Sequence, residues 1–311
     1  MDSMASTRNL ESWLDYISQQ HTEVIDMGLQ RFNQVLDQLQ RHKPAPTVIT
    51  VAGTNGKGTT CRMIEALLLQ GGYRVGTTLS PHIWRFNERI RLHGHDAGDE
   101  EICAAFAAID EARGDVPLTY FEFSALAALY CMAQAQVDVA ILEIGLGGRL
   151  DAFNAIDADI AVITSIGLDH QAFLGDTREA IGAEKAGILR SGQHVVLGQN
   201  MPSSVLQRCE ELSLKPKCWG TDFSSASDID QGTWQLSRQS HASLEVPLTA
   251  IAPHNIALAC EAVADMVELD LSLIAKCSAA YMPGRMDIRR IKDRMWILDV
   301  CHNPDGVRFF L

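Results

Sequence analysis

Apolar residues recur along the chain at two alternating spacings. Short runs rich in β-branched residues predict buried strands at 47–52, 137–144, 159–166, 194–197 and 295–300. Apolar residues three and four positions apart predict helices up to about residue 43, interrupted by a break at 21–29. The same spacing predicts further helices at 59–70, from about 122 to the next strand, and at 176–190, 254–268 and 271–280. Alternating strands and helices predict an α/β fold whose mostly parallel sheet carries helices on both faces.

The pattern changes between residues 217 and 246. Short segments rich in Ser, Asp and Gly alternate there with Trp234, Leu236, Leu244 and Val246, which predicts a small antiparallel edge made of hairpins. Pro283 and Gly284 then mark a hinge. We therefore expect one domain over 1–283 and the start of a second α/β domain over 284–311. That second stretch offers about one strand and one helical turn, too little for a core, so we expect this domain to be truncated.

Composition narrows the choice of partners. The 311 residues are 47% hydrophobic, which suffices for a packed core, and the formal net charge is −13. An acidic chain repels nucleic acid and anionic membrane surfaces, so we expect neither as a partner. No apolar run reaches about 18 residues, and the first ten residues lack the apolar centre of a signal peptide. Eight scattered cysteines without a CxxC pair indicate reduced thiols in a cytoplasmic protein.

A glycine-rich loop lies between the strand expected at 47–52 and the helix expected at 59–70. Its residues are Thr54, Asn55, Gly56, Lys57, Gly58 and Thr59. Backbone N–H groups at such a turn point at phosphate oxygens, the helix start adds partial positive charge, and Lys57 adds a full one. The hydroxyl of Thr59 or Thr60 suits Mg²⁺ or phosphate. The spacing departs from GxxxxGK[ST], because Gly58 stands between Lys57 and Thr59; a glycine-rich turn without a ligand is the alternative.

Eight further motifs follow in order over nearly the whole chain. They are IDMGL at 25–29, SPH at 80–82, YFE at 120–122, EIGLGGRLDA at 143–152, TSIGLDH at 164–170, EKAGI at 184–188, PGR at 283–285 and DVCHNP at 299–304. With the glycine loop, they make the chain resemble the Mur ligase superfamily and, more closely, its folylpolyglutamate synthase branch of the bifunctional dihydrofolate synthase type. Cys301 departs from the Ala that this branch usually has.

The resemblance implies a metal site and a catalytic set. It implies that Ser80, Glu143 and His170 bind two Mg²⁺ ions, and that Lys185 is carbamylated, which turns a cation that repels Mg²⁺ into a ligand. The catalytic residues implied are Lys57, Lys185 and His170. From the residues alone, Glu143 ends a strand opposite the glycine loop and suits Mg²⁺ or an ion pair with Arg149. A loop histidine and a helical lysine are more often structural.

ATP contacts beyond the loop are also implied by the resemblance. They are Asn255, Arg285 and Asp299. A guanidinium suits phosphate oxygens, and a hinge salt bridge is the lesser alternative for Arg285. Asn255 also suits a helix N-cap, and Asp299 a strand-end acid.

The pterin-substrate contacts implied by the resemblance fall in three segments. They are Asp26, Met27, Gly28 and Leu29; Thr119, Tyr120, Phe121 and Glu122; and Leu150, Asp151 and Ala152. The rings of Tyr120 and Phe121 suit packing against a planar pterin, although both also suit an ordinary core. The carboxylate of Asp26 suits a hydrogen bond from a pterin edge.

The activity implied is ATP-dependent amide ligation, in which L-glutamate is joined to dihydropteroate or to a reduced folate through an acyl phosphate. The resemblance also implies a monomer. Two other functions stay open: a Mur ligase acting on a UDP-muramyl peptide, which the motifs at 25–29 and 120–122 disfavour, and a non-catalytic ATP-binding module. The sequence does not decide between dihydrofolate synthesis, polyglutamate extension or both.

Overall fold

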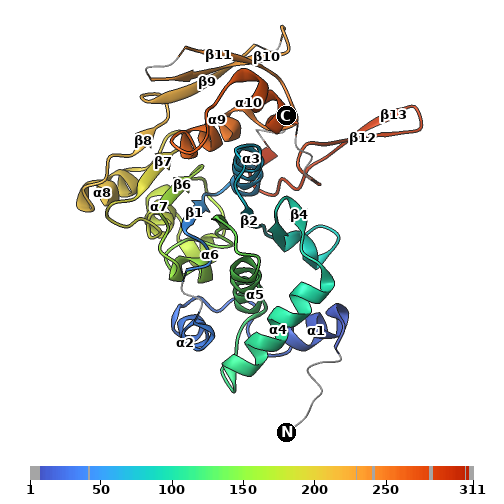
Figure 1. Cartoon of the computed structure of the whole chain (residues 1–311). Coiled ribbons are helices and arrows are strands. Elements are labelled where there is room, and N and C mark those ends of the chain that lie inside the picture. Colours follow the sequence, from blue (N-terminus) through green and yellow to red (C-terminus); the bar gives the residue numbers. More distant parts are fainter. Residues whose placement is uncertain are drawn as a thin grey trace.

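A central β-sheet organises the molecule (Figure 1). The computed structural model describes residues 8–40, 43–228, 230–239, 242–279, 283–304 and 306–307. The eight strands run in the order β4-β3-β2-β5-β1-β6-β7-β8. At the centre, β1 (Thr47–Ala52) pairs in parallel with β5 (Val139–Glu143) and β6 (Ile160–Ile163). These strands are almost wholly buried, in agreement with their continuous apolar runs.

The two edges of this sheet differ. Towards one edge, β7 (His194–Leu197) and the short β8 (Lys217–Cys218) continue the parallel pairing. On the other side, β2 (Val75–Thr78) pairs in parallel with β5, and β3 (Ile90–Leu92) and β4 (His95–Asp96) turn antiparallel. The predicted mostly parallel sheet is therefore confirmed, but β2, β3 and β4 were not predicted, because runs of two to four residues carry little periodicity.

Six helices cover one face of the sheet and share one apolar core. They are α1 (Leu10–Ile17), α2 (Gln30–Leu39), α4 (Asp99–Arg113), α5 (Tyr120–Gln134), α7 (Arg178–Ala186) and α8 (Ser203–Glu211). The i, i+4 pair Trp13 and Ile17 buries one side of α1 in this core. The predicted helices at the amino-terminal end and at 176–190 are confirmed, although residues 41–42 lie outside the described chain and α7 is shorter than expected.

The opposite face carries the second core. Its helices are α3 (Lys57–Gln70), α9 (Pro253–Ala262) and α10 (Leu271–Ser278). The expected helix at 59–70 thus begins two residues earlier, the one at 254–268 ends at Ala262, and residue 280 of the one at 271–280 lies outside the described chain. Helices therefore cover both faces, as predicted.

The hairpins predicted at 217–246 form a sheet of their own. Strands β9 (Phe223–Asp228), β10 (Thr233–Arg238) and β11 (Leu244–Pro247) are antiparallel, which confirms the predicted small antiparallel element, although they form a sheet separate from the main one. Trp234, Leu236 and Val246 are buried against α9 and its neighbours. The alternation of apolar and polar residues places these side chains on one face of the small sheet, and this face packs on a helix.

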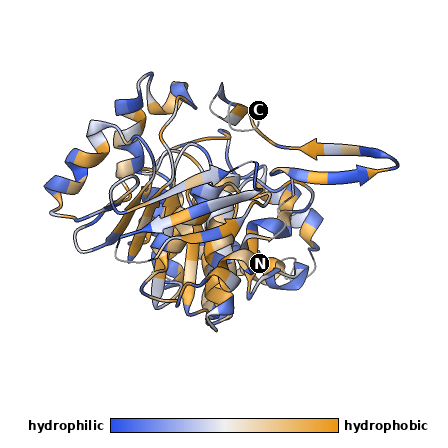
Figure 2. Ribbon diagram, turned by 90° about the horizontal axis from the view of Figure 1, so that it is seen from above, coloured by the Kyte–Doolittle hydropathy of each residue, from blue (hydrophilic) through white to orange (hydrophobic). Residues whose placement is uncertain are grey.

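A two-stranded hairpin follows Pro283 and Gly284. Strands β12 (Asp287–Ile291) and β13 (Arg294–Leu298) pair only with each other among the described strands and project from the body of the molecule (Figures 1 and 2). The strand expected at 295–300 is confirmed as β13, which ends before Asp299, whereas β12 was not predicted. Residues 305 and 308–311 of the predicted second domain lie outside the described chain, and the domain boundary stays a prediction.

Among the described residues, no helix combines the length and apolar character needed to span a membrane. All eight cysteines are free thiols, five of them buried.

The ion pair between Arg238 of β10 and Glu261 of α9 fastens the small sheet to the second core. Their side chains are only 14% and 7% exposed and lie 2.9 Å apart. We expect Arg238→Met to lower the free energy of unfolding by about 3–5 kcal/mol in urea denaturation, because it leaves a buried carboxylate without its partner. Arg208→Met on α8, where the ion pair with Glu211 is exposed, should cost under about 1 kcal/mol. Equal losses in both variants would contradict this role.

Candidate functional site

A cavity of about 1090 Å³ opens beside the carboxyl ends of β1, β5 and β6. Its lining contains every residue predicted to bind phosphate, metal or ATP: Thr54, Asn55, Gly56, Lys57, Gly58, Thr59, Ser80, Glu143, His170, Lys185, Asn255, Arg285 and Asp299. Parallel strands bring their carboxyl ends to one edge of a sheet, so the glycine loop, Glu143 and the loop that carries His170 meet there. None of the predicted pterin contacts lines this cavity.

The glycine loop makes a close turn at the start of α3. Gly56 is the N-cap of this helix and has a φ of +83°, a conformation that favours glycine. A Cβ at this position would lie 2.4 Å from Oδ1 of Asn255, so the turn and α9 approach too closely for any side chain. This Oδ1 is buried and has no hydrogen-bond partner among the residues that the structure describes. A hydrogen-bond acceptor of this kind suits a donor from a ligand such as an adenine amino group.

Two lysines converge on one carbonyl oxygen of the loop. Nζ of Lys57 donates hydrogen bonds to the carbonyls of Gly53, at 3.0 Å, and Thr54, at 3.2 Å. Nζ of Lys185, from α7, donates to the same Gly53 carbonyl at 3.0 Å. Burial, together with the positive charge of Lys57, lowers the pKa of Lys185 to about 7. Near neutral pH a large part of Lys185 is therefore an uncharged amine.

Glu143 faces the loop from the end of β5. One of its carboxylate oxygens accepts a hydrogen bond from the backbone N–H of Ser80 at 2.7 Å. Burial raises the pKa of Glu143, while the positive charges of Lys57, Arg285 and Arg89 oppose that rise. The predicted alternative, an ion pair between Glu143 and Arg149, was wrong, because Arg149 pairs instead with Glu184.

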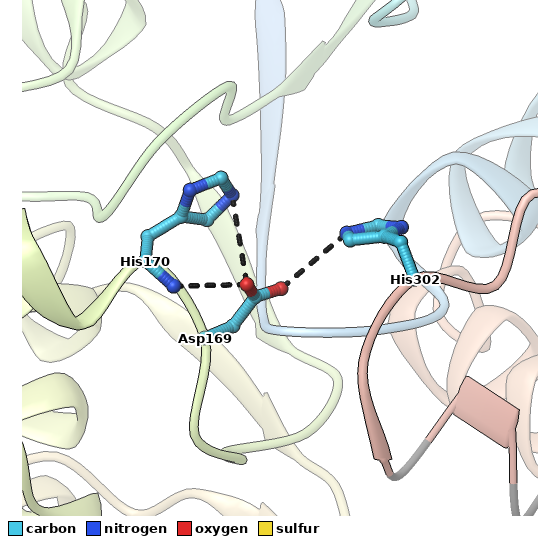
Figure 3. Close-up of side chains that lie close together, drawn as sticks. All are labelled: Asp169, His170 and His302. Atoms are coloured by element: carbon cyan, nitrogen blue, oxygen red, sulfur yellow. Dashed lines mark hydrogen bonds and ion pairs between the residues drawn. The ribbon is translucent and has the colours of Figure 1, made fainter.

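His170 stands at the cavity with two neighbours that the sequence analysis did not assign. Figure 3 shows His170 and His302 on either side of the Asp169 carboxylate. Nε2 of His170 lies 3.9 Å from Oδ1 of Asp169, and Nε2 of His302 lies 3.5 Å from Oδ2. Asn303 donates to the same carboxylate at 2.9 Å and exchanges two 3.0 Å hydrogen bonds with the side chain of Asn55. The glycine loop is thereby joined to the segment after β13.

Arg285 and Asp299 lie at the base of the β12–β13 hairpin. The carboxylate of Asp299 accepts hydrogen bonds from the N–H groups of Met286 and Cys301, both at 2.8 Å. It therefore closes the hairpin as well as lining the cavity. Arg285 lines both this cavity and a second one of about 560 Å³ that shares Ser80 and Glu143 with the first.

The predicted pterin contacts lie next to the cavity. Phe121 packs so tightly on the wall residue Gly145 that a Cβ there would meet its ring at 2.6 Å. Asp151 accepts hydrogen bonds from the N–H groups of Gly145, Leu146 and Phe153, and its burial raises its pKa to about 6. Phe121 and Asp151 therefore shape the cavity wall.

The segment at 26–29 is fastened to α5 by Arg31, which the sequence analysis missed. Nη1 of Arg31 donates to the Asp26 carboxylate at 2.6 Å, and Nη2 donates to the Asp26 carbonyl at 3.0 Å and to Glu122 at 3.1 Å. Glu122 also completes the capping box of α5 with Thr119. The five-residue offset from Asp26 to Arg31 was a visible signal, but the link to Glu122 spans 91 positions.

Taken together, the cavity suits a polyanion held with a divalent cation. Lys57, Arg285 and the helix start at Gly56 attract negative charge. Glu143 and His170 offer oxygen and nitrogen ligands at the same cavity.

The pKa of Lys185 leads to a pH test. In the folded protein an unmodified Lys185 is protonated mainly below about pH 7, whereas in the unfolded protein it is protonated up to about pH 10.5, its ordinary pKa. The free-energy cost of burying Lys185 is therefore largest below pH 7. We expect Lys185→Met to stabilise the fold near pH 7, and this gain to fall by about 1.4 kcal/mol per pH unit up to about pH 9. Urea denaturation of both proteins at several pH values measures it. A gain independent of pH would contradict a free amine with the lowered pKa.

Known proteins resemble this chain in sequence and in fold. The Mur ligase middle domain family matches residues 51–264. The dihydrofolate synthase/folylpolyglutamate synthase of Escherichia coli (strain K12) is 45% identical over 305 residues, which are 96% of this chain and 71% of that protein.

Solved structures are similar over nearly the whole chain. The structure of E. coli FolC in complex with DHPP and ADP has 43% identity and a TM-score of 0.92, over 98% of this chain and 74% of that one. A bifunctional folylpolyglutamate synthase/dihydrofolate synthase with Mn, AMPPNP and L-glutamate bound has 41% identity and a TM-score of 0.89, also over 98% of this chain and 74% of that one.

Proposed function

Because the chain belongs to the Mur ligase family, among the dihydrofolate synthase/folylpolyglutamate synthases, we propose that it joins L-glutamate to dihydropteroate and to reduced folates with ATP. The observation that carries the proposal is the placement of Lys57, Arg285 and Glu143 around one cavity at the glycine loop. Cations and a buried carboxylate at one helix start are what a metal-bound triphosphate requires.

The proposed reaction has two steps. The substrate carboxylate attacks the γ-phosphorus of ATP, an acyl phosphate forms, and ADP leaves. The α-amine of glutamate then attacks the acyl carbon, an amide forms, inorganic phosphate leaves, and the amine loses a proton. A carboxylate is a poor acyl donor near pH 7, and its phosphorylation makes the second step feasible. The protein contributes positioning and charge neutralisation, chiefly through Lys57 and Arg285.

The residues present fit the proposed magnesium ions. The buried Glu143 has a raised pKa, so it gains from a nearby cation that favours its ionised form. We assign Ser80 and Glu143 to one Mg²⁺ and His170 to a second. Magnesium, when bound, neutralises phosphate charge. The structure of a relative with Mn and AMPPNP bound supports a divalent cation together with a nucleotide.

Carbamylation of Lys185 is part of the proposal. Only an uncharged amine adds to CO2, and the pKa of about 7 makes that form available near neutral pH. The carbamate would replace the second ammonium at the Gly53 carbonyl with a carboxylate. It would thereby remove the repulsion between Lys185 and Lys57.

We propose that the segments at 26–29, 119–122 and 150–152 form the pterin side of the substrate site. They adjoin the glycine run of the cavity wall, where Phe121 and Asp151 contact Gly145. The relative with DHPP and ADP bound supports a pteroate-type ligand together with a nucleotide. We further propose a monomer, as the resemblance to this branch implies.

Lys57→Ala tests the proposed function. In the full-length protein it should abolish ATP-dependent glutamate ligation, because the loop loses the charge that faces the phosphates. Product formation from dihydropteroate, ATP and glutamate, and separately from tetrahydrofolate, measures it and separates the two activities. Lys215→Ala, an exposed lysine outside the cavity, is the matched control.

Three outcomes would reject the assignment. If Lys57→Ala still ligates glutamate, the glycine loop does not take part in the reaction as proposed. If the unaltered protein ligates a UDP-muramyl substrate instead of dihydropteroate, it is a cell-wall ligase. If it binds ATP without ligating or hydrolysing, it is a non-catalytic module.

Arg31→Gln tests the pterin segment. Because Arg31 holds both Asp26 and Glu122, its loss should raise KM for dihydropteroate about tenfold or more and leave KM for ATP unchanged. Arg31→Lys should restore little, since an ammonium lacks the fork that spans two carboxylates. Arg208→Gln on α8 is the control. A parallel rise of both KM values would indicate general damage to the fold.

A further inference from the structure

Asp169, His170 and His302 form a three-ligand cluster from two distant segments of the chain. Asp169 and His170 follow β6, whereas His302 follows β13. Their ligand atoms all lie within 4.8 Å of one another (Figure 3). Atoms bound at about 2.1 Å to one ion lie roughly 3 to 3.5 Å apart. The 3.5 Å and 3.9 Å separations to Asp169 therefore need only small side-chain rotations to accommodate an ion.

The tautomer of His302 is set for metal binding. Its Nδ1 lies 2.9 Å from the carbonyl oxygen of Val300. A carbonyl oxygen only accepts hydrogen bonds, so in the neutral ring Nδ1 carries the proton and the lone pair is on Nε2. Nε2 is the atom that faces Asp169. Metal-binding histidines commonly donate their other N–H to a backbone carbonyl in this way.

The chemistry of the three ligands indicates which ion they prefer. Two imidazoles with one carboxylate suit divalent transition ions, whereas Mg²⁺ prefers oxygen ligands and retains water. The histidine side chains are 49% and 58% exposed, so an ion can reach them from the cavity. Asp169 is held in place by hydrogen bonds from Asn303 and from the N–H of His170.

We propose that Asp169, His170 and His302 bind one divalent transition ion and thereby fasten the segment after β13 to the nucleotide cavity. The new element is His302, which adds a ligand from a segment 132 positions away from His170. The site shares His170 with the proposed second magnesium ion, so a transition ion would compete with magnesium there. The inference does not require ligase activity.

A cobalt titration tests the site. The probe is Co²⁺ added to metal-free, nucleotide-free protein without a polyhistidine tag, followed by its visible absorption. We expect one ion per chain, and at least tenfold weaker binding in both His302→Gln and His170→Gln. His95→Gln, an exposed histidine on β4, should bind as the unaltered protein does. Binding by His302→Gln at unaltered affinity, or equal losses in all three variants, would overturn the proposal.

Hydrogen exchange supplies the second readout. With Zn²⁺ as the probe, amides at 299–303 should exchange more slowly in the unaltered protein, because the ion joins this segment to the loop after β6. The same amides should be unaffected by Zn²⁺ in His302→Gln. Slowing in both proteins would reject His302 as the ligand. These readouts are separate from catalysis: a protein that fails to ligate glutamate yet binds Co²⁺ through His302 loses the proposed function and keeps this site.

Discussion

Two ammonium groups meeting at one carbonyl oxygen constrain the whole site. Lys57 and Lys185 both donate to the carbonyl of Gly53, and the Lys185 side chain is buried away from the water that would screen its charge. The pKa of about 7 for Lys185 reduces the repulsion between the two lysines, because it leaves part of Lys185 uncharged near neutral pH. Any ligand that brings negative charge to the glycine loop offsets the repulsion that remains between the two lysines. A bound polyanion therefore stabilises the arrangement of the two lysines.

The sheet makes this convergence possible. β1, β5 and β6 are adjacent and parallel, so the glycine loop, Glu143 and the loop that carries His170 all emerge at one edge. Helices on the two faces then supply the remaining groups: Lys185 from α7 and Asn255 from α9. Because each group is held by a separate element, the site depends on the register of the sheet more than on any single loop.

The sequence predicted the parts of this arrangement that are written locally. The strand at 47–52, the loop and the helix behind it follow from residue type and spacing, and the wider residue set followed from resemblance to a known family. The small antiparallel sheet was predicted, but its separation from the main sheet was not, because alternation shows which side chains are buried but not what they pack against. Arg31, Asp169 and His302 were missed as interaction partners, because contacts over 91 to 133 positions are set by tertiary packing alone.

The side-chain pair of Asn55 and Asn303 has a mechanical consequence. Asn303 has 7% of its surface exposed and uses its amide for Asn55, for Asp169 and for the N–H of Gly306. A nucleotide that reorients the side chain of Asn55 would break two of these hydrogen bonds together. Loss of these hydrogen bonds would weaken the attachment of the segment after β13, so the mobility of the β12–β13 hairpin would depend on whether a nucleotide is bound at the glycine loop.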